Sequence, residues 1–409
     1  MRRLLGLVVL LGGGIACPTW SAAQSATSVP KAPGRICAND DCVTTTPAPA
    51  PAPAPASPDG VKWNPGHYVR IGGTLAPDKL PQLESELADI CSNRNIKGVS
   101  IQPYWKMLEG DKRGDYSAGF ALIDDILESV AACNKQLMIH LKERDFGARY
   151  SSVVSPSKLT KQYPAYLMTS EYGPCCSASG TQVNLGGVVA SGADVAWTGN
   201  LRSISRTWDP AVMDRLIALS QAYARRYDEH PNFEMLSLGE STVGAPSFDA
   251  TGYYKQLKRW YSEAAKHWPH TVMRMTLNFV RGDSTMLDLI EHCSTLSNCA
   301  VGGPDPELPL PDIERRIQAN QVFRGVRCED CVAKDFRGTV AWVGEVQDLG
   351  LTVRYNETPR EVQTYQMKTM NNSYMVWNRN GVWSEIVKQI NADPSVASTD
   401  CPANFPACN

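Results

Sequence analysis

Short apolar segments alternate with amphipathic helical segments from about Trp63 to Ile390, and no other feature of the sequence constrains the fold as strongly. This alternation is typical of a parallel sheet whose strands are joined by helical crossovers. We expect eight strands, at His67–Gly72, Gly98–Pro103, Leu137–Leu141, Phe233–Leu238, Thr271–Phe279, Ala300–Gly302, Thr339–Val343 and Tyr374–Trp377.

The segments between these strands carry apolar residues at helical spacing, as Leu83, Leu87 and Ile90 do. Asp209 followed by Pro210 is a typical helix start, because Asp caps free N–H groups and proline suits the first turn. Eight strand–helix units over about 330 residues fit a (β/α)8 barrel with insertions. A doubly wound open sheet is the alternative, but it usually has a Gly-rich nucleotide loop after an early strand, and none is present. The sequence therefore predicts an α/β protein with one TIM barrel over residues 61–392.

One connection is much longer than the others. About sixty residues between the third expected strand and Asp209 lack clear periodicity, against a usual loop length of about 4–6 residues. The segment is rich in Gly and Ser and holds several aromatic residues, including Tyr163, Trp197 and Trp208. We expect it to be a functional insertion after strand three.

The first sixty residues do not fit the barrel pattern. Arg2 and Arg3 precede an apolar run that ends in small residues, which is the order of a signal peptide over residues 1–23. Processing as a lipoprotein at Cys17 is the less favoured alternative. Residues 24–60 follow, with two cysteines and a Pro/Ala-rich linker that favours an extended chain. Residues 393–409 form a C-terminal tail.

Cysteine usage also indicates export. Twelve of the thirteen cysteines lie after Cys17, and disulfides persist mainly in periplasmic or extracellular proteins. The pairs close in sequence are Cys37 with Cys42, Cys293 with Cys299, Cys328 with Cys331, and Cys401 with Cys408, while Cys91 and Cys133 follow successive helices and could join them. The partners of the adjacent Cys175 and Cys176 stay open.

Charge and hydropathy exclude two classes of partner. The net charge is −2 and nothing resembles the basic stripe that nucleic-acid binding requires. No segment after the signal peptide is long and apolar enough to span a bilayer, which takes about 20 residues. We expect an exported protein without a nucleic-acid partner or a transmembrane segment.

Active sites of TIM barrels lie at the carboxyl ends of the strands, so polar and aromatic residues there are candidates for the site. Asp305 and Glu307 follow strand six. The other candidates are Arg70, Tyr104, Trp105, Glu143, Glu240, Asn278, Glu345, Trp377 and Asn378. Aromatic candidates, with Trp197 and Trp208, could stack on sugar rings or could simply pack in the core.

Two of these candidates share a distinctive context. Glu240 and Glu345 each follow an apolar strand and a glycine directly, which places a carboxylate at the barrel mouth. Glycoside hydrolysis requires two such groups, one to protonate the leaving oxygen and one to attack the anomeric carbon or activate water. The pair predicts a glycosidase that needs neither a metal nor another cofactor.

The chain resembles the clan A glycoside hydrolases over most of Trp63 to Gln389. Residues 104–109 and 114–116 are similar to their second barrel unit. The resemblance implies a retaining mechanism with Glu240 as acid/base, Glu345 as nucleophile, and carboxyl groups about 5–5.5 Å apart. It also implies that Trp377 floors a sugar subsite. Many members have Asn directly before the acid/base, whereas this chain has Gly239.

Two other readings stay open. A carbohydrate-binding barrel without turnover would keep the fold and hold sugar with either carboxylate replaced. A metal-dependent hydrolase would need Asp and His at strand ends, and His140 is the single histidine near one. Cys328 to Cys331 has the spacing of half a zinc site, but a small disulfide loop suits an exported chain better. No Gly-x-Ser-x-Gly elbow is present, which disfavours a serine esterase.

Overall fold

The computed structural model describes residues 60–75, 77–146, 159–179, 182–191, 201–241, 248–278, 280, 283–304, 336–346, 357–368, 370–379 and 381–409. These residues belong to one compact unit. The signal peptide and most of the linker, Trp197, Asp305, Glu307 and the Cys37–Cys42 and Cys328–Cys331 pairs lie outside the described residues.

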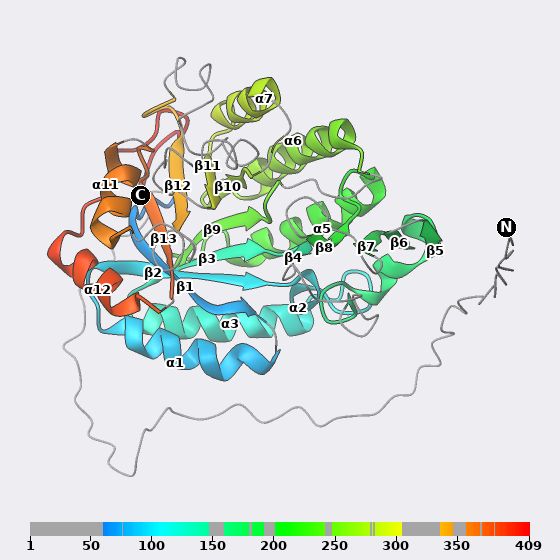
Figure 1. The fold of residues 1–409 in the computed structure, drawn as a ribbon, viewed down its shortest axis with the longest axis horizontal. Coiled ribbons are helices and arrows are strands. Elements are labelled where there is room, and N and C mark those ends of the chain that lie inside the picture. The colour runs from blue at the N-terminus through cyan, green and yellow to red at the C-terminus, as the bar shows by residue number, and fades with distance from the viewer. Residues whose placement is uncertain are drawn as a thin grey trace, which may run out of the picture. The chain divides into compact units, whose positions relative to one another are not determined.

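Eight parallel strands close into a barrel, in the order β1-β13-β12-β11-β10-β9-β3-β2 (Figure 1). They are β1 (Gly66–Leu75), β2 (Ile96–Pro103), β3 (Gln136–Leu141), β9 (Phe233–Leu238), β10 (Val272–Thr276), β11 (Cys299–Pro304), β12 (Ala341–Val346) and β13 (Tyr374–Asn378). The predicted (β/α)8 barrel is confirmed. The seventh strand begins and ends later than expected, so Glu345 lies within it rather than after it.

Helices lie outside the strands (Figure 1). The described helices are α1 (Leu80–Cys91), α2 (Trp105–Leu108), α3 (Ser117–Ala132), α5 (Pro210–Tyr227), α6 (Ala250–His267), α7 (Asp283–Ser294), α11 (Pro359–Lys368) and α12 (Trp383–Ala392), with 3-10 turns at Pro77–Lys79, Ala165–Met168 and Ser170–Tyr172. The start of α5 is as predicted, because the Asp209 side chain accepts a hydrogen bond from the Ala211 N–H.

Alternation along the strands produces two apolar layers. Side chains such as Val69, Met375 and Trp377 pack in the layer between strands and helices. Their neighbours Tyr68, Tyr374 and Val376 belong to a separate cluster with residues from the other strands, which fills the inside of the barrel. Because successive strand residues point to opposite faces, a shift of one position decides whether a side chain faces the barrel interior or the helices.

The segments at both ends of the unit pack against the interior cluster. Val61 pairs with Cys408 across an isolated bridge, and Trp63 packs edge-on against Tyr374 and Phe405. The predicted tail therefore contributes to the barrel core.

The insertion after β3 forms a second, five-stranded antiparallel sheet in the order β4-β8-β7-β6-β5. Its strands are β4 (Arg144–Phe146), β5 (Cys175–Ser179), β6 (Gln182–Leu185), β7 (Val188–Ser191) and β8 (Leu201–Ser205). A buried carboxylate fixes part of it to the barrel helices: Glu109 accepts hydrogen bonds from Trp105, Tyr166 and Arg215.

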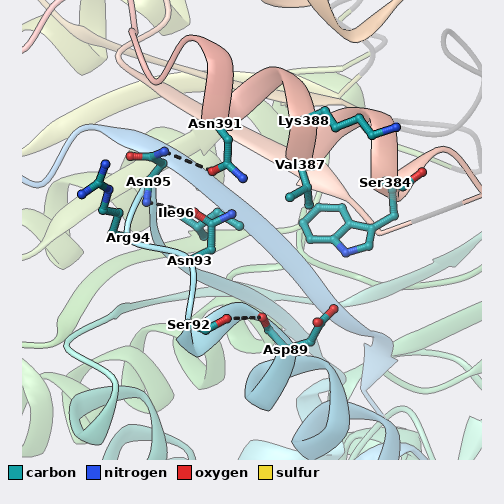
Figure 2. Close-up of a pocket in the computed structure, with 11 residues that line it drawn as sticks. Asp89, Ser92, Asn93, Arg94, Asn95, Ile96, Ser384, Val387, Lys388 and Asn391 are labelled. Carbon is teal, nitrogen blue, oxygen red and sulfur yellow. Dashed lines mark hydrogen bonds between the residues drawn. The ribbon is translucent and has the colours of Figure 1, made fainter. Parts of the chain in front are cut away.

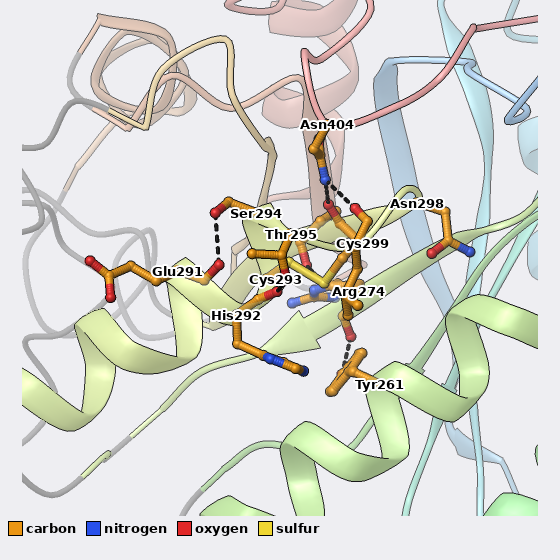
Figure 3. Close-up of a disulfide and its surroundings, with 12 residues drawn as sticks. Tyr261, Arg274, Glu291, His292, Cys293, Ser294, Thr295, Asn298, Cys299 and Asn404 are labelled. Atoms are coloured by element: carbon orange, nitrogen blue, oxygen red, sulfur yellow. Dashed lines mark hydrogen bonds between the residues drawn. A yellow bond between two sulfur atoms is a disulfide. The ribbon is translucent and has the colours of Figure 1, made fainter.

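Three of the expected disulfides are present: Cys91–Cys133, Cys293–Cys299 and Cys401–Cys408. The second joins the end of α7 to the start of β11 (Figure 3). Cys175 is a free thiol. No helix among the described residues is both long and apolar enough to cross a membrane.

Candidate active site

Glu345 lies inside the barrel near the carboxyl end of β12. Its partner in the register with β13 is Val376, a member of the interior cluster, so both side chains face inward. The carboxylate is almost completely buried and forms an ion pair with Arg70 of β1. Its Oε2 lies 3.4 Å from Nη1 of Arg274, on β10. Such neighbours favour the ionised form of a carboxylate.

His140 of β3 completes this cluster. Its Nδ1 lies 3.5 Å from Glu345 Oε2 and 3.3 Å from the amide nitrogen of Gln102. Burial, and then the charges of Arg274 and Arg70, hold the pKa of His140 well below its usual value. The imidazole is therefore neutral near pH 7 and adds no positive charge beside Glu345.

Glu240 follows β9 and is half-buried. The Asn278 side-chain amide donates a 2.5 Å hydrogen bond to Glu240 Oε2. Ser241 fixes the two segments to each other, because its hydroxyl donates to the Asn278 carbonyl and accepts from the Asn278 N–H. One oxygen of Glu240 is thus oriented by the Asn278 amide.

Glu143 is packed against this segment, two residues after the end of β3. It is buried, pairs with Arg144, and accepts a 3.1 Å hydrogen bond from the backbone N–H of Gly239. A Cβ at position 239 would overlap with Glu143 Oε2. The glycine before the acid/base candidate is therefore explained by the space that Glu143 occupies.

Tyr104 connects the barrel to the insertion. Its hydroxyl donates to Asp145 Oδ1 at 2.9 Å and accepts from the Gln162 amide at 3.2 Å. The Lys142 ammonium lies 5.6 Å from the centroid of the Tyr104 ring, and burial lowers the pKa of Lys142. These polar groups follow β2 and β3, so they lie at the same end of the barrel as Glu240.

Asn378 ends β13 and pairs in register with Arg70 of β1. It is half-buried, and its side-chain oxygen is buried without a hydrogen-bond partner in the described part of the chain. This amide oxygen, in the strand beside Arg70, is a suitable acceptor for a hydrogen bond from a sugar hydroxyl.

The structure does not place two predicted aromatics in the site. Trp377 is completely buried in the layer between strands and helices, where its indole N–H donates to His67 Nδ1 at 3.0 Å. Trp105 is also completely buried, and its indole bonds to Glu109. Both predictions of sugar stacking are wrong for this conformation, because these rings are on the helix side of the barrel. Trp208, another aromatic candidate, packs edge-on against Phe248.

Arg274 is not among the predicted site residues because it lies inside a strand, and His140 was predicted only as a histidine near a strand end and not as a neighbour of Glu345. The sequence does contain an indication of their role, which is a polar residue type within an apolar strand. Arg274 interrupts the strand Val272 to Thr276, where a buried charge is costly unless it is paired. The same argument applies to His140 in β3.

A polar groove lies apart from these residues, on the outside of the barrel between α1 and α12 (Figure 2). It contains none of the predicted site residues. Its lining includes the half-buried indole of Trp383 and the hydrogen-bonded pair Asn95 and Asn391.

Comparison with known proteins finds similarity in the fold. No protein-family model and no curated protein matches the chain. Several solved structures of endo-glycoceramidase II from Rhodococcus sp. do match, at 13% identity. One covers 82% of this chain and 81% of its own, with a TM-score of 0.54. Its cellobiose-like imidazole complex has the same coverage and a TM-score of 0.53. Its lactosyl-enzyme intermediate covers 78% and 75%, with a TM-score of 0.51.

The chain therefore shares the (β/α)8-barrel fold of these endo-glycoceramidase structures. Counted along the chain, β9 is the fourth strand of the barrel and β12 is the seventh. Glu240 and Glu345 therefore lie at the strand positions that the sequence resemblance associates with acid/base and nucleophile.

Proposed function

We propose that this protein is an exported glycosidase that cleaves a poly- or oligosaccharide by a retaining double displacement. The observation that supports this most directly is the contrast between its two carboxylates. Glu345 is buried between two arginines, and Glu240 is half-buried beside the neutral amide of Asn278. Different surroundings suit different roles: an ionised nucleophile and a group that exchanges protons.

In the first step, Glu345 attacks the anomeric carbon while Glu240 gives its proton to the departing glycosidic oxygen. In the second step, Glu240 takes a proton from water as the water oxygen attacks the same carbon, and Glu345 leaves. Asn278 orients Glu240 in both steps. Tyr104, Lys142 and Asn378 supply polar contacts for sugar hydroxyls at the same end of the barrel.

Export is part of the proposal. The sequence begins with a signal-peptide pattern, and the three disulfides of the described unit suit an oxidising compartment. We expect the mature protein in the periplasm or outside the cell.

The test is hydrolysis of a panel of aryl glycosides and oligosaccharides by the mature protein. The panel begins with cellobiosyl and lactosyl compounds, because structures of the endo-glycoceramidase hold a cellobiose-like inhibitor and a lactosyl group. Glu240→Gln and Glu345→Gln should each reduce kcat at least about 1,000-fold, as expected for groups that take part in bond breaking. The exposed Glu385→Gln on α12 is the matched control and should keep wild-type activity.

Azide separates the two roles. With an activated aryl β-glycoside, Glu240→Ala should regain turnover in azide and release the β-glycosyl azide. Glu345→Gly should release the α-glycosyl azide, because azide then replaces the nucleophile. Full activity in either Gln variant would contradict the assignment, and binding of sugar without hydrolysis by any form would favour a binding barrel.

A further inference from the structure

Glu345 has a separate arginine for each of its oxygens. Arg70 of β1 pairs with Oε1, whereas Nη1 and Nη2 of Arg274 lie 3.4 Å and 3.5 Å from Oε2. Arg274 is almost completely buried, with 2% of its side chain exposed. A buried guanidinium is strongly unfavourable without a carboxylate partner, so its position within a strand of the barrel needs an explanation.

The fold leaves room for Arg274 at this position. A Cβ on Gly302, in the neighbouring strand β11, would lie 2.5 Å from Arg274 Nε. The backbone of Arg274 is also anchored from outside the barrel, because the Tyr261 hydroxyl of α6 donates to its carbonyl (Figure 3). The space and the anchor together hold the guanidinium against Glu345.

His140, which also contacts the Glu345 carboxylate, does not replace this charge. Its imidazole is neutral near pH 7 for the reasons given above. Glu240 is close enough for its charge to act on Arg274. Arg274 therefore lies in the field of both carboxylates, and its contact is with the nucleophile.

We propose that Arg274 is a positioning residue that makes Glu345 a better leaving group and thereby speeds hydrolysis of the glycosyl-enzyme. This inference rests on the proposed function. In the second step, the bond between the anomeric carbon and a Glu345 oxygen breaks and its electron pair returns to the carboxylate. The water oxygen forms the new bond, and its proton goes to Glu240. Negative charge grows on Glu345 in this step, where a second guanidinium stabilises it.

The experiment follows loss of the covalent intermediate. The mature protein is incubated with 2,4-dinitrophenyl 2-deoxy-2-fluoro-β-cellobioside or the corresponding lactoside, because the good leaving group forms the adduct and fluorine slows its hydrolysis. After removal of the probe, intact-protein mass spectrometry measures how fast the adduct disappears, and peptide mapping identifies the labelled residue.

Arg274→Met removes the charge, Arg274→Gln keeps a hydrogen-bond donor without charge, and Arg274→Lys keeps the charge. We expect Met and Gln to slow loss of the adduct about 10- to 100-fold, the effect of one charge-assisted hydrogen bond. Lys should remain within about fivefold of wild type. Arg226→Met, which removes an exposed ion pair between α5 and Asp124 of α3, is the matched control and should have no effect.

Wild-type rates of adduct loss in both Met and Gln variants would overturn the proposal. If Arg274→Lys slowed adduct loss as much as the uncharged variants do, the proposal would also be overturned, because the shape of the arginine side chain rather than its charge would then matter. Circular dichroism of each variant identifies any that fails to fold. If either Arg274→Met or Arg274→Gln fails, the rate of adduct loss in the other one decides whether the proposal holds. If the wild type forms no adduct and hydrolyses no glycoside of the panel, the proposed function fails and this inference fails with it.

Discussion

The backbone N–H of Gly239 donates a hydrogen bond to the buried carboxylate of Glu143, at 3.1 Å from N to Oε2. Glu143 comes from the end of β3 and Gly239 from the end of β9, so the contact joins two neighbouring barrel strands immediately before Glu240. The same carboxylate fills the space next to the glycine, which leaves no room for a side chain.

Gly239→Ala should therefore damage both stability and activity. The new Cβ overlaps with Glu143 Oε2, and relief of that overlap should cost about 1–3 kcal/mol, as other overpacking changes do. Glu240 should move with the backbone and kcat should fall at least about tenfold. Urea unfolding and the rate on the best panel substrate measure the two effects. The control is Gly381→Ala, at an exposed position where a Cβ meets nothing within 4 Å; equal effects at both positions would contradict the explanation.

Glu143→Gln should lower the free energy of unfolding by about 3–5 kcal/mol. The change leaves the Arg144 guanidinium buried without its carboxylate, which is more costly than the loss of an exposed ion pair. Asp288→Asn provides the comparison, because it breaks the exposed pair with Lys258 and should cost less than about 1 kcal/mol. Denaturant unfolding of the two variants tests this ranking.

Asn278→Asp should shift the pH dependence of catalysis. A carboxylate beside Glu240 favours its protonated form, so the alkaline limb of the kcat/KM profile should move to higher pH. Asn278→Ala removes the 2.5 Å hydrogen bond and should reduce kcat/KM about tenfold without that shift. Asn391→Ala, in the groove between α1 and α12, should leave the profile unchanged. An unmoved alkaline limb in the Asp variant would argue against Glu240 as the proton donor.

Acidification should destabilise the fold through His67. Burial lowers the pKa of His67 to about 4, and its Nδ1 accepts the Trp377 indole N–H, so protonation there would break that bond. The unfolded chain, with a histidine pKa near 6.5, binds the proton first as the pH falls. The contribution of neutral His67 to the free energy of unfolding is thus fully present above about pH 6.5 and is lost as the pH falls toward 4. At pH 5 the free energy of unfolding should be lower by about 2 kcal/mol.

Urea unfolding at pH 7 and pH 5 checks this expectation. His67→Gln, which keeps an acceptor for Trp377, should lose about 2 kcal/mol less than wild type between the two pH values. The exposed His267→Gln on α6 should retain the wild-type dependence. Identical pH dependence in wild type and His67→Gln would show that another group is responsible.

The disulfides should differ in their contribution to stability. Cys91–Cys133 closes a loop with a sequence separation of 42, and Cys293–Cys299 one with a separation of 6 (Figure 3). Restriction of the unfolded chain predicts losses of about 4 and about 2 kcal/mol when each pair is replaced by alanine. Thermal unfolding of the two double variants measures the order, and the reverse order would contradict the loop-length explanation.

The sequence alone predicted the barrel because strand and helix periodicities are local properties. The sequence also singled out Glu240 and Glu345, since a carboxylate directly after an apolar strand and a glycine is visible without a structure, and their catalytic roles stay predictions. Trp377 was assigned to the wrong face because adjacent strand residues point in opposite directions, and only the register with β1 and β12 decides which direction is inward. Trp105 begins a short helix, α2, and its ring packs in the layer between strands and helices, which the sequence pattern did not indicate.

Two features were decided by the tertiary structure alone. The insertion after β3 forms a sheet through pairing between segments whose own patterns are weak, and such pairing has no local signal. Arg274 and His140 lie beside Glu345 because closing the barrel brings side chains from β3, β10 and β12 to one point across its interior. Local periodicity thus determined which elements form, and barrel closure determined which charges meet, because side chains distant in sequence become neighbours only when the sheet closes on itself.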